Sequence, residues 1–267
     1  MAVRTEYCLL GPLIVRRDGV DVPVPPGKQR AVLAVLLLNS GRIVPVDEIA
    51  ETLWGSAPPP SARVTVRNYV KRLRQALGDS GRALIMTQPP GYLMGVRADD
   101  LDVSRFEALA GAARSAARRG QWDTTATQAS AALALWRGEP LADVESERLA
   151  AREAPRLAEI RLQALEARID ADLRLGRCAE VIAELQLLAG DHPLREHLHA
   201  QLMLAYYWSG RQAEALAVYQ HARQVLREEL GAEPGGELRE LHQQMLAADP
   251  DLAAPAAGRL TAAGSGP

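Results

Sequence analysis

Cysteine and long apolar runs are both scarce in this chain of 267 residues. The two cysteines, Cys8 and Cys178, lie far apart and match neither a disulfide framework nor a metal site, which favours a reducing cytoplasm. No stretch reaches the ~18 unbroken apolar residues that a membrane helix requires. Residues 1–6 show no charged segment followed by an apolar one, so we expect no signal peptide. These absences predict a cytoplasmic protein that does not associate with membranes.

Motifs of nucleotide-binding and metal-dependent enzymes are missing as well. There is no Gly-x-Gly-x-x-Gly, and Gly27-Lys28 lacks the upstream glycine and the following serine or threonine of a phosphate-binding loop. His192, His197 and His199 are close in sequence, but residues 197 and 199 point to different sides of a helix and no cysteine or acid completes a ligand set. We therefore predict a protein that is not an enzyme and that uses no cofactor or metal.

What the chain does have is an uneven distribution of charge. Residues 1–97 carry 13 lysines and arginines against 7 acids, about +6, whereas the remainder carries 18 against 26, about −8. Such asymmetry is typical of a nucleic-acid-binding module joined to a second part with another role.

Short strands and helices alternate in the first hundred residues. The pattern predicts strands over 7–15 and 20–24, with a turn at Asp18-Gly19 between them. Helices are expected over 29–39 and 46–54, and the first of these is apolar on nearly all sides, which indicates that it is buried in a small bundle.

A third helix, over residues 62–77, is amphipathic and basic. Ser61 is a suitable N-cap, and Gly78 stands where a glycine ends many helices. Residues 83–87 and 92–96 then predict a β-hairpin. The apolar stripe of the third helix, at i, i+4, i+7 and i+11, consists of Val66, Val70, Leu73 and Leu77. Strands, three helices and a closing hairpin describe an α+β winged helix-turn-helix domain, which we assign to residues 1–98.

The rest of the chain predicts an all-α domain over residues 99–248, and we expect residues 249–267 to be disordered. A segment that begins at Gly176 repeats at Gly210, an offset of 34 residues, which is the tetratricopeptide period. A weaker third copy begins at Gly120, and its irregular offset indicates an insertion around residues 137–154. This domain is therefore predicted to be tetratricopeptide-like.

The chemistry that points to DNA is concentrated on the third helix. Its cations can neutralise phosphates, Asn68 can pair with an adenine edge, and Arg67 or Arg72 can pair with guanine. The hairpin would form a wing beside this helix. The candidate DNA-binding residues are Arg63, Val64, Thr65, Arg67, Asn68, Lys71, Arg72, Arg74, Arg82, Gly91 and Tyr92.

Two other functions remain open from the residues alone. The basic helix could be a solvated surface, in which case the helical repeats would make the protein an interaction scaffold. The helical groove could also serve a small-molecule-sensing regulator.

Several short motifs together resemble the Streptomyces antibiotic regulatory protein family. In these proteins an OmpR/PhoB-type winged helix precedes a bacterial transcriptional activation domain. The matching residues are Leu9-Leu10-Gly11-Pro12-Leu13, Leu53-Trp54-Gly55, Tyr69-Val70, Leu73-Arg74, Leu77-Gly78, Pro90-Gly91-Tyr92, Leu135-Trp136-Arg137-Gly138 and Leu230-Gly231.

The resemblance implies a transcription activator of secondary-metabolite (antibiotic) biosynthesis genes. It implies binding to double-stranded DNA at direct repeats near the promoter −35 region, by two protomers side by side, with recruitment of RNA polymerase through sigma and other subunits. The helix over residues 62–77 would then read the bases. Larger relatives carry an ATPase module or a phosphothreonine-reading domain, neither of which occurs in these 267 residues.

Overall fold

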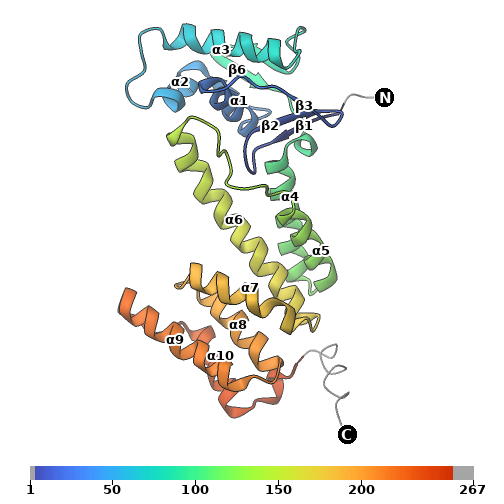
Figure 1. The fold of residues 1–267 in the computed structure, drawn as a ribbon, viewed down its shortest axis with the longest axis vertical. Helices are drawn as coiled ribbons and strands as arrows, with labels where there is room; N and C mark the ends of the chain where they lie inside the picture. Colours follow the sequence, from blue (N-terminus) through green and yellow to red (C-terminus); the bar gives the residue numbers. More distant parts are fainter. Residues whose placement is uncertain (1–3, 255–267) are drawn as a thin grey trace. The chain divides into compact units, whose positions relative to one another are not determined.

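Two small antiparallel sheets and three helices form the N-terminal part of the chain in the computed structural model, which describes residues 4–254 (Figure 1). The first sheet has the order β1-β2-β3, and Asp18 and Gly19 both adopt positive φ in the predicted turn. Its strands are β1 (Thr5–Cys8), β2 (Ile14–Arg17) and β3 (Val20–Val22).

The second sheet consists of the expected hairpin and one further strand, in the order β4-β6-β5. The hairpin confirms the sequence prediction, whereas the extra strand is three residues long, too short to show an alternating pattern. Its strands are β4 (Ile43–Pro45), β5 (Ile85–Gln88) and β6 (Gly91–Met94).

The helices α1 (Lys28–Leu38), α2 (Val46–Trp54) and α3 (Ala62–Ala76) pack against one another. Residues 31–37 are all buried, which confirms that α1 lies inside the bundle. Ser61 precedes α3 but its side chain caps no backbone N–H, contrary to expectation. Instead, the Thr65 hydroxyl donates to the Ser61 carbonyl at 3.0 Å.

After Met94 the described residues contain helices and no further strand, so the predicted fold class is confirmed. A short 3₁₀ turn, Ala98–Asp100, leads into this part. The helices are α4 (Asp102–Arg118), α5 (Trp122–Leu133), α6 (Glu147–Arg174), α7 (Cys178–Asp191), α8 (Glu196–Trp208), α9 (Gln212–Leu230) and α10 (Gly236–Ala247).

Three glycines end helices with the same turn geometry, which Gly78 and Ala248 also adopt at the ends of α3 and α10. Gly120, Gly176 and Gly210 each adopt positive φ, and each donates its N–H to the carbonyl three residues before it. In each case the next residue donates to the carbonyl five residues before it, which completes a Schellman motif. The repeated glycine segments therefore mark equivalent helix ends, while the tetratricopeptide assignment stays a prediction.

The predicted disorder from residue 249 is wrong at its start. Residues Pro250–Leu252 form a 3₁₀ turn, and the Trp208 indole N–H donates to the Leu252 carbonyl at 2.9 Å. The remainder of that prediction, residues 255–267, lies outside the described residues. None of the described helices combines the length and the hydropathy needed to span a bilayer.

Contacts divide the chain into two compact units. One contains residues 1–111 and 131–162, and the other contains residues 112–130 and 163–267. The sequence places residues 131–162 with the helical domain, whereas their contacts group them with the winged helix. A segment of that stretch, residues 137–148, is called the strap below.

The strap is held by the segment that the sequence assigns to a continuous strand, residues 9–13. Here β1 ends at Cys8 and β2 begins only at Ile14. The freed backbone pairs with the strap, because Arg137 N donates to Leu10 O at 2.8 Å and Leu141 N donates to Leu9 O at 3.0 Å. The expected strand is therefore interrupted by a connection to residues more than a hundred positions away.

Asp102 and Asp143 reinforce this connection. The buried Asp102 carboxylate accepts the N–H groups of Leu9 at 2.8 Å and Leu10 at 3.0 Å. Burial raises the pKa of Asp102, although these backbone hydrogen bonds and nearby Arg137 oppose that rise. Asp143 of the strap accepts from Leu13 N at 2.7 Å and pairs with Arg30 of α1.

Candidate nucleic-acid interface

Helix α3 presents an apolar side to the core and a polar side to solvent. Val66, Val70 and Leu73 are fully buried, and Leu77 just beyond the helix is 2% exposed, which confirms the predicted stripe. Val64 on the opposite side is 57% exposed. The outer face, as we call it, consists of Val64, Arg67, Asn68, Lys71, Arg72 and Gln75, all of them exposed.

Three cations and two amides on this outer face, that of Gln75 among them, have no partner in the described part of the chain. The side chains of Arg67, Asn68, Lys71 and Arg72 make no hydrogen bond or ion pair there. Their binding groups are thus available to a ligand. A row of such donors suits phosphate oxygens and base edges.

Two other predicted contacts, at the start of α3, already have partners. Arg63 donates to both carboxylate oxygens of Asp47 in α2, at 2.7 and 2.6 Å. Both side chains are about two-thirds exposed, so the pair is weak and could exchange for a phosphate. The Thr65 hydroxyl is bonded to the Ser61 carbonyl, although its methyl group stays available.

Arg74 faces the hairpin. Its Nε and Nη2 donate to the Ile85 carbonyl at 3.0 and 2.6 Å, and Nη2 also donates to the Thr87 hydroxyl at 2.8 Å. The guanidinium lies 5.8 Å from the centre of the Tyr92 ring. This cation of α3 therefore binds both strands of the wing.

Gly91 and Tyr92 are buried at the start of β6. A Cβ atom on Gly91 would lie 1.8 Å from the Val44 carbonyl oxygen, so only glycine allows β4 and β6 to approach this closely. Tyr92 is 6% exposed. Both residues build the wing, and contact with DNA stays a prediction for each. Arg82, in the loop before β5, is exposed and has positive φ.

Two residues that support α3 do not stand out in the sequence. Arg17 of β2 donates to the Leu77 carbonyl at 2.5 Å, where the helix ends. The Asp79 carboxylate accepts the N–H groups of Leu84 and Ile85 at 3.0 and 2.9 Å. The position of Asp79 directly after the helix-ending Gly78 is the only trace of this role in the sequence.

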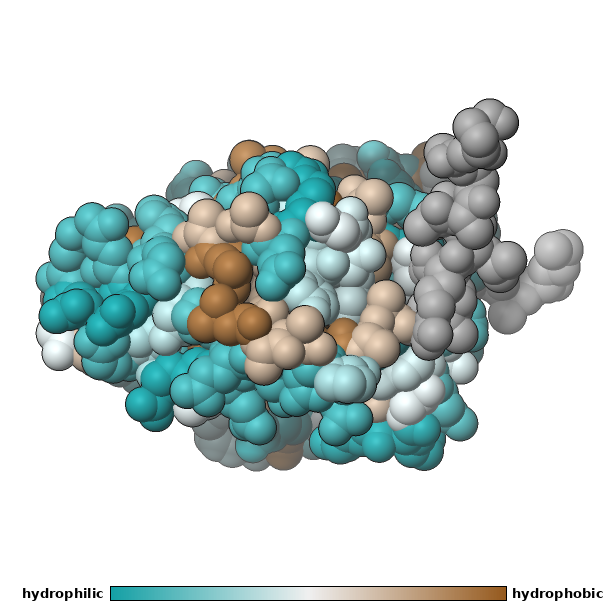
Figure 2. Space-filling model, turned by 90° about the horizontal axis from the view of Figure 1, so that it is seen from below, coloured by the Kyte–Doolittle hydropathy of each residue, from teal (hydrophilic) through white to brown (hydrophobic). Residues whose placement is uncertain are grey.

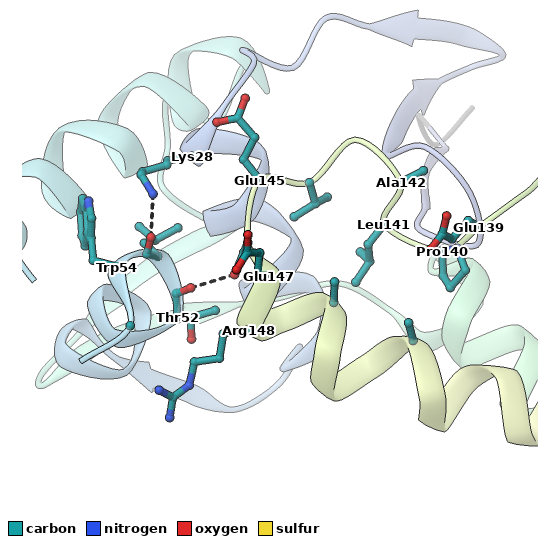
Figure 3. A pocket seen from close by; sticks show the side chains of 16 residues that line it. Lys28, Thr52, Trp54, Glu139, Pro140, Leu141, Ala142, Glu145, Glu147 and Arg148 are labelled. Atoms are coloured by element: carbon teal, nitrogen blue, oxygen red, sulfur yellow. Dashed lines mark hydrogen bonds between the residues drawn. The ribbon is translucent and has the colours of Figure 1, made fainter. Parts of the chain in front are cut away.

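A hollow of about 800 Å³ in the winged-helix unit lies elsewhere, between the strap and the helices α1 and α2 (Figure 3). Several of its polar groups are paired within the protein. Lys28 Nζ donates to the Leu53 carbonyl at 2.6 Å and lies 5.5 Å from the centre of the Trp54 ring. The Ser146 hydroxyl donates to the Thr52 carbonyl at 2.7 Å. This hydrogen bond joins the strap to α2.

The histidine-rich segment makes contacts that do not resemble a metal site. His197 Nε2 lies 3.2 Å from Asp170 Oδ2, and His199 Nε2 lies 2.9 Å from the Pro193 carbonyl. The described residues contain no group of three or more histidine, cysteine or acidic side chains placed to hold a metal ion.

The helical unit has a smaller apolar groove of about 370 Å³ between α7, α8 and α9. The face in Figure 2 is mostly hydrophilic, with small hydrophobic patches.

Two family models match this chain in tandem. "Transcriptional regulatory protein, C terminal" matches residues 25–94, and "Bacterial transcriptional activator domain" matches residues 101–246. The first covers α1 to β6, with the outer face of α3, and the second covers α4 to α10. The chain belongs to the Streptomyces antibiotic regulatory protein family.

Relatives support this membership over most of the chain. The regulatory protein DnrI of Streptomyces peucetius is 39% identical over 91% of this chain and 93% of its own length. The transcriptional regulatory protein EmbR of Mycobacterium tuberculosis is 39% identical over 98% of this chain and 68% of its own length. The regulatory protein AfsR of Streptomyces coelicolor is 44% identical over 93% of this chain but only 25% of its own.

A solved structure agrees with the fold. EmbR of Mycobacterium tuberculosis, in complex with a low-affinity phosphopeptide, superimposes with a TM-score of 0.89 at 39% identity. The match covers 93% of this chain and 66% of that one. EmbR is named as a transcriptional regulatory protein, and AfsR and DnrI are named as regulatory proteins. The family is therefore one of transcription regulators, whose members AfsR and EmbR are longer than this chain.

Proposed function

We propose that this protein is a sequence-specific DNA-binding transcription activator that reads bases through the outer face of α3. The observation that supports the proposal is the unpartnered set of Arg67, Asn68, Lys71 and Arg72 on one exposed side of a rigid helix. The 15 residues of α3 span roughly 22 Å at ~1.5 Å per residue, and such a helix fits the major groove of B-DNA, ~12 Å wide.

The roles within the set follow from side-chain chemistry. Asn68, near the middle of the helix, is the candidate for bidentate pairing with adenine, and Arg67 or Arg72 for pairing with guanine. Lys71 carries a point charge suited to phosphate. Val64 and Thr65 can contact a thymine methyl group, and Arg63 and Arg82 can reach the flanking backbone.

The wider function is proposed from the family. Two protomers would bind direct repeats near the −35 region side by side in the cytoplasm, and the acidic helical part would contact sigma and other subunits of RNA polymerase. The genes controlled would belong to secondary-metabolite (antibiotic) biosynthesis, in line with the similarity to DnrI and AfsR.

Selection of bound sequences from a random DNA pool at two salt concentrations tests the proposal. The wild type should enrich a direct repeat, and an Arg67→Ala/Lys71→Ala variant should not. Its matched control is Arg105→Ala/Arg239→Ala, which removes the same charge outside the winged helix and should enrich the wild-type motif.

Two outcomes of this selection are informative. A motif lost only in the α3 variant supports DNA reading by the outer face. Equally poor binding by all three proteins overturns the proposal and leaves the outer face as a solvated surface. In that case the helical part would become the site of function, as a protein-interaction scaffold or a small-molecule sensor.

A further inference from the structure

Arg74 differs from the other cations of α3 in what its side chain binds. Arg67, Lys71 and Arg72 have no partner in the described part of the chain, and Arg63 holds an exposed carboxylate. Arg74 instead donates to a main-chain carbonyl of the wing. The sequence suggests from its charge that Arg74 binds phosphate, but in the fold its guanidinium binds the wing.

The structure assigns Arg74 a positioning role: it fixes the wing relative to the reading helix and does not itself bind phosphate. This inference rests on the proposed function. Its forked bond to the Ile85 carbonyl and its bond to Thr87 hold strand β5. Its position over the ring of Tyr92 adds a contact with β6, so one side chain connects α3 to both strands of the wing.

The peptide groups around Ile85 are held from two sides. Arg74 donates to the Ile85 carbonyl, while the Asp79 carboxylate accepts the Ile85 N–H. Leu77 lies between Arg74 and Asp79 in the sequence, at the end of α3. Arg17 fixes this helix end by donating to the Leu77 carbonyl. If Arg74 turned toward DNA, the Ile85 carbonyl would lose its charged donor and the Tyr92 ring its cation. That exchange offers little net gain, because one charge-assisted bond replaces others.

Lysine substitution distinguishes the two roles, because lysine retains the charge but not the planar fork. If Arg74 bound a phosphate, Arg74→Lys would keep most of the affinity. If it positions the wing, Arg74→Lys and Arg74→Ala should both weaken binding to the selected site, by roughly tenfold, about the value of one hydrogen bond to a charged group.

Hydrogen exchange of the free protein supplies a readout that does not involve DNA. Both Arg74 variants should exchange the amides of residues 85–94 several-fold faster than the wild type, because the wing opens locally more often. The control is Lys71, which is exposed on the outer face. Lys71→Ala should leave wing exchange unchanged and lower the slope of log K against log salt by about one, whereas Lys71→Arg should retain binding.

The outcomes separate failure of this inference from failure of the proposed function. Wild-type affinity and unchanged wing exchange in Arg74→Lys would overturn the positioning role while leaving DNA binding intact. If the wild type binds no DNA selectively, the proposed function fails. Faster wing exchange in both Arg74 variants would even then support Arg74 as the residue that holds the wing.

Discussion

The outer face of α3 and the surroundings of the strap both concentrate charge, but they use it differently. On the outer face, Arg67, Lys71 and Arg72 point into solvent without a partner in the described part of the chain. Around the strap, Asp102 binds backbone N–H groups and Asp143 pairs with Arg30.

The difference shows which charges mark an interface. A buried charge is costly unless it is paired, so the buried Asp102 beside the strap must have its partners inside the protein. An exposed charge has little free-energy cost in water, and it remains available to bind a ligand. Arg74 shows that membership of a basic helix is not sufficient, since the same helix contains charges of both kinds.

Asp102→Ala should destabilise the protein by about 3–5 kcal/mol, because two buried N–H groups, those of Leu9 and Leu10, would lose their acceptor. Urea unfolding followed by circular dichroism would measure the loss. Asp102→Asn keeps one acceptor oxygen and should lose less. An unchanged midpoint for the alanine variant would show that the carboxylate does not hold residues 9–13.

Asn68→Ala should relax specificity at one base position at a cost of roughly 1–3 kcal/mol, with no loss of folding stability, since its side chain binds nothing within the described residues. Competition binding against single-base variants of the selected site would measure it. Gln243→Ala, which removes an exposed amide of α10 outside the winged helix, is the matched control. An equal loss on every sequence would assign Asn68 to phosphate instead.

Asp143→Ala should cost roughly 1–2 kcal/mol of stability, because the Leu13 N–H and Arg30 would both lose a partner. Glu145→Ala removes an exposed acid of the same strap and should change stability by less than about 0.5 kcal/mol. Thermal unfolding of the three proteins compares them. Equal melting temperatures for both variants would place Asp143 among the solvated charges.

The smallest effect is expected for the His197–Asp170 pair of the helical unit. The hydrogen bond to Asp170 raises the pKa of His197 above its ordinary value of 6.5. Its stabilisation is therefore complete below about pH 6.5 and is lost as pH rises through the raised pKa. The stability difference between wild type and His197→Ala should be larger at pH 6 than at pH 8, by roughly 0.2–1 kcal/mol.

The contribution of His199 to stability changes with pH in the opposite direction. Burial lowers the pKa of His199, so this contribution falls as pH drops below 6.5. Its effect cancels in the comparison, since both proteins retain it. Thermal unfolding at the two pH values provides the measurement, and a difference that grows toward pH 8 would contradict the assignment. DNA affinity should not change in His197→Ala, because the pair belongs to the other compact unit and includes none of the proposed DNA-binding residues.

Local sequence pattern was sufficient for much of the fold and for part of the site. The spacing of Val66, Val70 and Leu73 shows which side of α3 is buried, and by elimination which side is exposed. Gly120, Gly176 and Gly210 mark three equivalent helix ends because their conformation is disfavoured for other residues. Strand β4 depends on pairing with β6, which is remote in sequence, so no local pattern shows it. The interruption of the first strand has a local sign in Gly11-Pro12, but its partner, the strap, is remote in sequence.

The fold class, the family and the basic character of α3 follow from the sequence alone, because they depend on periodicity, turn residues and short motifs. The tertiary structure alone decided which charges are free. Arg74 and Arg67 are the same residue type on the same helix, yet only one lies within reach of the Ile85 carbonyl. Likewise, residues 137–148 join the winged helix because hydrogen bonds connect positions that are close in space and far apart in the chain.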